Sequence, residues 1–233
     1  MIKIEKVVLP SPEQWDIIIE GMRNPKNSWD KSDSYKTYIE DPETLQTADF
    51  EFFIGENDLK LMKQLSNAGK DHRKYMRMIP VYVDITAPLF WWKEFDTYKV
   101  GTVANSCSTM HKIHGKEFTL DDFSHEHLFD ANMLCVHHSG DFRYMSNKQW
   151  LIFTIDLLNE QRKAFLETDN KDHWWQIIQL LPSSYNQKRT VFLNYEVLAN
   201  MYHARKHHKL TEWVNFCYWI KTLPYHELIT GED

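Results

Sequence analysis

The chain has 233 residues, of which 42% are hydrophobic and 26% charged, an ordinary composition for a folded globular protein. Its net charge of −6 with 12 histidines leaves no broad basic field, which argues against DNA or RNA as the main ligand. The three cysteines are widely spaced and form no CxxC pair, so a disulfide framework is not expected and a reducing compartment is favoured.

The segment from Met1 to Leu9 mixes lysine and glutamate into its apolar run, which is unlike a signal peptide. The longest apolar stretches, such as residues 88–92, are far too short to span a membrane. We therefore expect a soluble, cytoplasmic protein. The 9 Trp, 11 Tyr and 13 Phe favour a thick core or faces buried between subunits.

In the first half of the chain, hydrophobic periodicity and turn residues predict alternating strands and helices. Pro12 at a first helical position and Pro88 after a run of β-branched residues mark two of the boundaries. In chain order we expect a strand at 2–9, a helix at 12–22, a long polar loop at 25–50, a helix at 58–67, a strand at 78–87 and a helix at 90–95.

Residues 101–117 are rich in Gly, Ser, Thr and His and predict a loop. Helices are expected from Ser146 to Phe165, from His173 to Leu181 and from Thr211 to Thr222. The longest helical pattern covers 185–208, where Val191, Tyr195, Leu198 and Tyr202 form a narrow stripe. No linker or internal repeat divides the chain, which predicts a single domain over residues 1–233.

The C-terminal pattern is Leu181-Pro182, then Asn194, Asn200 and Arg205, and it resembles the flavin-dependent thymidylate synthases. Members of that family carry a Leu-Pro and then a helix with two asparagines and an arginine at the same spacing. On the predicted helix, Asn194 and Arg205 project within about 20° of each other and Asn200 about 120° away. Polar groups on two faces of one helix suit a site assembled between subunits, as in the family's homotetramers.

A second segment follows the predicted strand, where Ala87-Pro88 and the aromatic run precede Lys93-Glu94. The family has Arg-Gln there and then its signature RHRxxSxNExSxRY. Aligned without gaps, this chain keeps the frame but reads Thr97-Tyr98-Lys99, Thr102, Ala104, Asn105, Cys107, Thr109 and Met110. The family's arginines, whose guanidinium groups would bind phosphates bidentately, are therefore replaced in this chain. Glu196 also stands where the family usually has an arginine.

The resemblance implies an α+β fold with a small antiparallel sheet flanked by several long helices. It makes Asn194, Asn200 and Lys99 candidates for binding FAD. Candidates for binding a dUMP-like nucleotide are Lys93, Glu94, Asn105, Ser106, Cys107, Ser108 and Arg205. NADPH and methylenetetrahydrofolate would take part only if catalysis is retained.

Three functions follow from these observations. The first is a divergent flavin-dependent thymidylate synthase that moves a methylene group and a hydride onto a pyrimidine nucleotide. The second is a catalytically inactive homo-oligomer of the same fold that binds a nucleotide or a protein partner, favoured by the loss of arginines in separate segments. The third is an unrelated helical interaction protein whose surface aromatics mark the partner face.

Metal and nucleophile chemistry fit the residues less well. His203 and His207 are spaced i, i+4, but Lys206 and Lys209 lie beside them and favour a solvated basic helix end. The groups His125-x-His127 and Cys135-x-His137-His138 carry metal-ligand residue types, and we expect no metal. Cys107 with His111 or His114 has the composition of a nucleophile and base, although an inert cysteine is favoured. Neither GxGxxG nor GxxxxGK[ST] occurs.

Overall fold

The computed structural model describes residues 2–40, 47–131, 133–136 and 142–232, which form two compact units. Unit 1 comprises residues 86–95 and 106–189 with the first residues of the chain, and unit 2 comprises residues 4–85, 96–105 and those from 190 onward. The chain passes from unit 2 to unit 1 within β4 (Pro80–Pro88) and returns to unit 2 for residues 96–105. It then enters unit 1 again and makes its last return within β8 (Asn186–Asn194). The predicted single-domain organisation stays a prediction.

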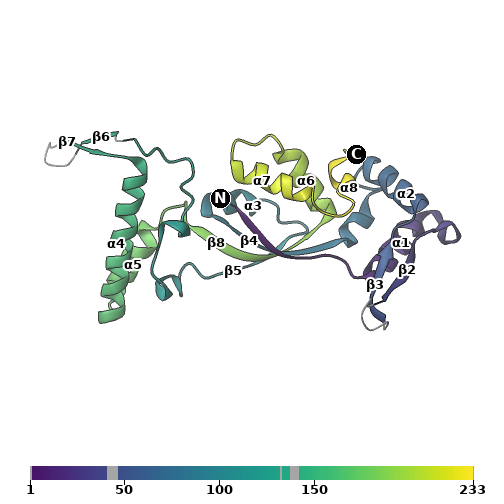
Figure 1. Ribbon diagram of the computed structural model, residues 1–233, viewed down its shortest axis with the longest axis horizontal. Coiled ribbons are helices and arrows are strands. Elements are labelled where there is room, and N and C mark those ends of the chain that lie inside the picture. The colour runs from purple at the N-terminus through teal and green to yellow at the C-terminus, as the bar shows by residue number, and fades with distance from the viewer. Residues whose placement is uncertain (1, 41–46, 132, 137–141, 233) are drawn as a thin grey trace. The chain divides into compact units, whose positions relative to one another are not determined.

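Unit 2 holds most of a four-stranded sheet with the order β1-β4-β8-β5. Its strands and helices are β1 (Lys3–Val8), α1 (Pro12–Arg23), β2 (Tyr35–Glu40), β3 (Thr47–Phe53), α2 (Glu56–Asn67), β5 (Val103–Ser106), α6 (Tyr195–Arg205), α7 (Thr211–Ile220) and α8 (Glu227–Thr230). Helix α6 packs on α7 and α8, and the three lie together in Figure 1. Tyr195, Trp213 and Phe216 are fully buried there and anchor the core of this unit.

Local signals explain where the helices of unit 2 begin. Ser11 and Gln14 form a reciprocal capping box in front of α1, and Pro12 occupies its first turn. Asn194 caps α6, because its side-chain oxygen accepts the backbone N–H of Val197 at 3.0 Å. Three short 3-10 turns, at 24–26, 29–31 and 74–78, connect the longer elements.

Unit 1 is built on two packed helices, α4 (Asn147–Thr168) and α5 (Lys171–Leu180), which lie side by side in Figure 1. Its other elements are α3 (Leu89–Phe95), β6 (Met133–Val136), β7 (Phe142–Met145) and 3-10 turns at 113–115 and 120–122. Strands β6 and β7 form an antiparallel hairpin. The core of unit 1 consists of Ile113, Phe118, Phe123, Leu151, Ile155, Leu158 and Ile177.

The α+β prediction is confirmed, and so are the predicted strands at 2–9 and 78–87. The helices predicted at 12–22, 58–67, 90–95, 146–165, 173–181 and 211–222 all form, with ends shifted by a few residues. Among the described residues, none of the helices combines the length and apolar character that a bilayer crossing requires.

The predicted helix over 185–208 is wrong. Residues 186–194 form strand β8, and a helix begins only at Tyr195. Val191 and Leu193 are fully buried and Phe192 lies on the other face, so the apolar residues follow the two-residue period of a strand. Asn194 therefore precedes α6 as its cap, and the geometry expected for Asn194 and Arg205 on one helix does not exist.

Two predicted loops also contain strands. Within 25–50, β2 pairs antiparallel with β3, and Tyr38 packs on Phe50 across the hairpin with ring centroids 4.8 Å apart. Such cross-strand aromatic pairs stabilise a hairpin whose sequence otherwise reads as polar. Residues 41–46 lie outside the described residues. Within 101–117, Val103–Ser106 forms β5 at the end of the four-stranded sheet.

Candidate functional site

A cavity of about 520 Å³ in unit 1 contains two of the predicted substrate-binding residues, Cys107 and Ser108. We call it the Cys107 pocket. Its walls come from the segment after β5, the 3-10 turns and the first residues of β8. The lining residues are Thr86, Cys107, Ser108, Thr109, Lys112, Ile113, Lys116, Asp122, Tyr185, Asn186, Gln187 and Lys188.

Strand β8 fixes the backbone of Cys107 on both sides. The Cys107 N–H donates to the carbonyl oxygen of Lys188 at 2.9 Å, and the Gln187 carboxamide donates to the Cys107 carbonyl at 2.8 Å. Gln187 is in turn held by Arg189, whose Nε donates to Gln187 Oε1 at 3.0 Å and whose guanidinium lies 4.2 Å from the Trp92 ring centre. Cys107 is therefore held in place by a partly buried hydrogen-bond network.

The Cys107 pocket carries an excess of positive charge, because three lysines face one aspartate. Lys116 pairs with Asp122 at 2.5 Å, and Lys112 and Lys188 are the other two cations of the lining. Burial would raise the pKa of Asp122, but hydrogen bonds from Lys116 and Thr119 outweigh it and lower that pKa. A pocket with this charge attracts anions, phosphates among them.

The alternative pairing of Cys107 with a histidine base is not supported. The ring of His114 packs edge-on against Phe165, with centroids 4.9 Å apart, and does not line the pocket. His114 Nδ1 is buried and has no hydrogen-bond partner among the residues that the structure describes. His111 is exposed, and it also is absent from the pocket wall.

Arg205, the nucleotide candidate of unit 2, lies in an aromatic cluster. Its Nε donates to the Tyr98 hydroxyl at 2.9 Å, and its guanidinium lies 4.9 Å from the Trp213 ring centre. Its Nη1 is 3.0 Å from His208 Nε2. Arg205 is therefore in contact with the segment after α3 through Tyr98. Lys99, the next residue, is exposed.

The asparagine candidates already have structural partners. Asn194 caps α6, and a Cβ at Gly101 would lie 2.8 Å from its side-chain nitrogen. The Asn200 oxygen accepts a hydrogen bond from Arg73 at 3.0 Å. Both asparagines therefore contribute to the fold of unit 2, whatever else they bind.

Glu196, which stands where the family usually has an arginine, is neutralised by two arginines. Arg77 forms a bidentate hydrogen-bonded pair with it, and Arg73 Nε lies 3.5 Å from the carboxylate. The hydrogen bond from Arg77 outweighs the effect of burial and lowers the pKa of Glu196. Because both arginines lie more than a hundred positions earlier, no local sequence pattern indicated this pairing.

The remaining predicted residues do not line the Cys107 pocket. Lys93 is exposed and Glu94 half-buried on α3, while Asn105 and Ser106 are exposed at the end of β5. Gln187 and Lys188 were missed by the sequence analysis, because they fell inside the wrongly predicted helix. An alternating reading of 186–194 would have placed them at the start of a strand.

Metal-ligand side chains are not gathered in the described part of the chain: no group of three or more His, Cys, Asp or Glu there is arranged to hold an ion. His137 and His138 of the Cys135 group lie outside the described residues.

The sequence matches no family model and no curated protein. The structure is similar to "flavin dependent thymidylate synthase ThyX from helicobacter pylori complexed with FAD and dUMP", with a TM-score of 0.62, 14% identity, and 99% of this chain and 98% of that chain covered. It is also similar to a "UMP/dUMP methylase PolB from Streptomyces cacaoi bound with 5-Br dUMP", with a TM-score of 0.62, 15% identity, and 99% and 95% covered. The chain therefore has the fold of the flavin-dependent thymidylate synthases.

Proposed function

We propose that this chain binds a pyrimidine nucleotide in the Cys107 pocket, with the phosphate held by lysines. The observation that carries the proposal is the excess of positive charge around Cys107 and Ser108, in a cavity of about 520 Å³. Small-molecule sites typically have volumes of about 300–1,000 Å³. Similar structures contain dUMP or 5-bromo pyrimidine nucleotides, which supports the same ligand class here.

The lysines of the Cys107 pocket would bind phosphate as point charges, without the bidentate hydrogen bonds that arginine forms. Lys112 would neutralise the phosphate, and the Ser108 hydroxyl, which accepts the His111 N–H at 2.9 Å, can donate its own proton to a phosphate oxygen. The exposed Cys107 thiol would lie within the same pocket as the bound nucleotide.

The flavin candidates do not fit a cofactor site within one chain. Asn194 uses its carboxamide oxygen on the cap of α6, Asn200 uses its own on Arg73, and Lys99 offers one exposed ammonium. FAD, and with it NADPH and methylenetetrahydrofolate, stays a prediction of the resemblance, so our proposal includes no hydride or methylene transfer. These contacts favour the second hypothesis, in the form of a protein that binds a nucleotide but does not convert it.

Alkylation of Cys107 tests the proposal directly. We expect iodoacetamide to modify Cys107, which is exposed, and dUMP or UMP to slow the reaction at least about tenfold at saturation. Cys217 serves as an internal control, because burial raises its pKa to about 11 and keeps the thiol protonated. Mass spectrometry of a Cys135→Ser background would measure the rate at each remaining cysteine.

The replacement Lys112→Ala should weaken this protection about tenfold, as expected for the loss of one charge-assisted phosphate contact. Lys209→Ala replaces an exposed lysine of unit 2 and is the matched control. In this variant the nucleotide should slow alkylation of Cys107 as much as in the parent. Equal protection by uridine without a phosphate, or none by either nucleotide, would show that the pocket is not a nucleotide site.

We further propose that the chain assembles into a homo-oligomer, as the family's tetramers suggest, through α4. At 100° per residue, Trp150, Phe153 and Leu157 fall within an arc of about 60° and are all exposed. This stripe lies away from the buried stripe of α4, which is formed by Leu151, Ile155 and Leu158. Exposed apolar stripes of this kind mark interaction surfaces.

Light scattering should show an assembly larger than one chain, and Trp150→Ser with Phe153→Ser should lower its mass. Leu166→Ser is the control, since Leu166 is exposed on the same helix but lies off the stripe. A parent protein that is monomeric at micromolar concentration would refute this part of the proposal, and an unchanged mass in the double variant would refute the role of the stripe.

A further inference from the structure

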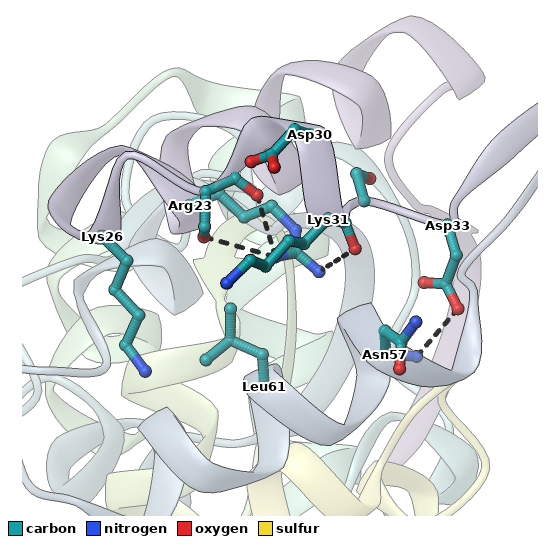
Figure 2. A pocket seen from close by; sticks show the side chains of 9 residues that line it. Arg23, Lys26, Asp30, Lys31, Asp33, Asn57 and Leu61 are labelled. Atoms are coloured by element: carbon teal, nitrogen blue, oxygen red, sulfur yellow. Dashed lines mark hydrogen bonds between the residues drawn. The ribbon is translucent and has the colours of Figure 1, made fainter.

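A cavity of unit 2 contains none of the residues singled out by the resemblance. It has a volume of about 720 Å³ and lies between the 3-10 turns after α1 and the start of α2. Figure 2 shows its lining, which consists of Arg23, Lys26, Ser28, Asp30, Lys31, Ser32, Asp33, Asn57 and Leu61.

A buried ion pair holds the wall of this cavity in shape. Arg23 Nε and Asp58 Oδ1 are 2.5 Å apart, and both side chains are almost completely buried. The other Arg23 donors bind the Ser28 and Lys31 carbonyl oxygens at 3.1 and 2.9 Å, which fixes the turn that carries Lys26 and Lys31. These bonds use both Nη atoms of Arg23, so its guanidinium supports the cavity wall.

The aspartates of the lining are directed elsewhere. Asp33 accepts the backbone N–H groups of Asn57 and Asp58 at 2.9 and 3.1 Å and so caps α2. In Figure 2 the Asp30 carboxylate lies on the opposite side of the Arg23 guanidinium from Lys26 and Leu61. The end of the cavity near Leu61 therefore receives no carboxylate from its own lining.

The lining supplies two lysines at that end. Lys26 and Lys31 both extend toward Leu61 in Figure 2, and neither forms an ion pair with a carboxylate among the described residues. Two ammonium groups beside an apolar side chain suit a dianionic head joined to an organic group, since lysine binds phosphate as a point charge. A phosphate monoester carries nearly two negative charges at neutral pH.

We propose that this cavity is a second binding site, specific for small phosphate monoesters. The phosphate lies between Lys26 and Lys31, and the organic part lies against Leu61. The volume is within the range of small-molecule sites, and the buried Arg23–Asp58 pair makes the cavity preformed. This site belongs to unit 2 and does not depend on the nucleotide proposed for unit 1.

Residue-resolved NMR of the isotope-labelled full chain provides the test, with phenyl phosphate as the probe. We expect saturable shifts at the amides of Ser28, Asn57 and Leu61, with weaker binding of inorganic phosphate and no response to phenol. Because the readout is local, binding at the Cys107 pocket produces shifts at other residues and is not confused with this site.

The double variant Lys26→Ala/Lys31→Ala should lose at least about tenfold in affinity for phenyl phosphate. Lys60→Ala removes an exposed lysine of α2 that does not line the cavity, and it should bind like the parent. Both variants keep the Arg23–Asp58 pair, so an unchanged melting temperature verifies the fold. The proposal is overturned if these amides do not shift in the parent, if phenol binds as well, or if the double variant binds as tightly as the parent.

Discussion

Replacing Asp58 by asparagine should destabilise the protein by about 3–5 kcal/mol, the usual cost of breaking a buried ion pair by removing one partner. The Asp58 carboxylate is fully buried and accepts hydrogen bonds from Arg23, Ser32, Ser34 and the backbone of Asp33. An asparagine of the same size keeps the volume but leaves the Arg23 charge without compensation. Urea denaturation followed by circular dichroism measures the change.

A double-mutant cycle separates the ion pair from the other contacts of Asp58. Arg23→Gln with Asp58→Asn should cost clearly less than the sum of the two single variants. Asp16→Asn is the control, because Asp16 pairs with Lys36 at 3.1 Å on the surface, and its loss should cost less than about 1 kcal/mol. Additive costs in the cycle would mean that the two charges are not coupled.

The same carboxylate makes stability depend on pH. Burial acts to raise the pKa of Asp58, but hydrogen bonds from Ser34, Ser32 and Arg23 outweigh it and lower the pKa in the folded state. The unfolded value is near the usual ~3.9. The contribution is therefore complete above about pH 4 and is lost as the pH falls through the folded pKa. The Asp58→Asn variant should show a flatter loss of stability in acid than the parent.

Gly101→Ala should cost about 2–3 kcal/mol through two effects on one loop. Gly101 has φ +82°, a left-handed conformation that costs an L-residue about 1–2 kcal/mol. The added Cβ would also lie 2.8 Å from the side-chain nitrogen of Asn194. Asn194 cannot move away without weakening the cap of α6, which is worth about 1 kcal/mol.

Combining Gly101→Ala with Asn194→Ala tests this explanation. In the Asn194→Ala background the glycine replacement should cost only the free energy of the left-handed backbone conformation. The costs of the two changes should therefore be less than additive. Gly115→Ala is the matched control, since its Cβ would meet no atom within 4 Å, and it should change stability by less than about 0.5 kcal/mol. Equal costs at Gly101 and Gly115 would contradict the proposed crowding of Asn194.

The sequence predicted most helices because their signals are local. Ser11-Pro12 and Ser146 mark helix starts through caps that involve only their immediate neighbours. The error at 185–208 arose because a short buried strand leads directly into a helix, and a stripe drawn through both has an apparent helical period. Burial on the sheet, which is a tertiary property, decided the conformation of Val191 and Leu193.

The candidate site was predictable only in part, for the same reason. Cys107 and Ser108 were predicted from the spacing of a sequence motif. That spacing is preserved as long as the alignment contains no gaps. Lys188 and Gln187 join them through hydrogen bonds that cross about eighty positions of sequence, and no window of sequence contains both partners. The Arg23–Asp58 pair spans 35 positions and likewise has no local signature.

The cap on α6 limits what Asn194 can indicate about activity. The Asn194 side-chain oxygen accepts the Val197 N–H whether or not a cofactor is present. An asparagine at this position therefore accords with the fold, and evidence for an activity has to come from other positions.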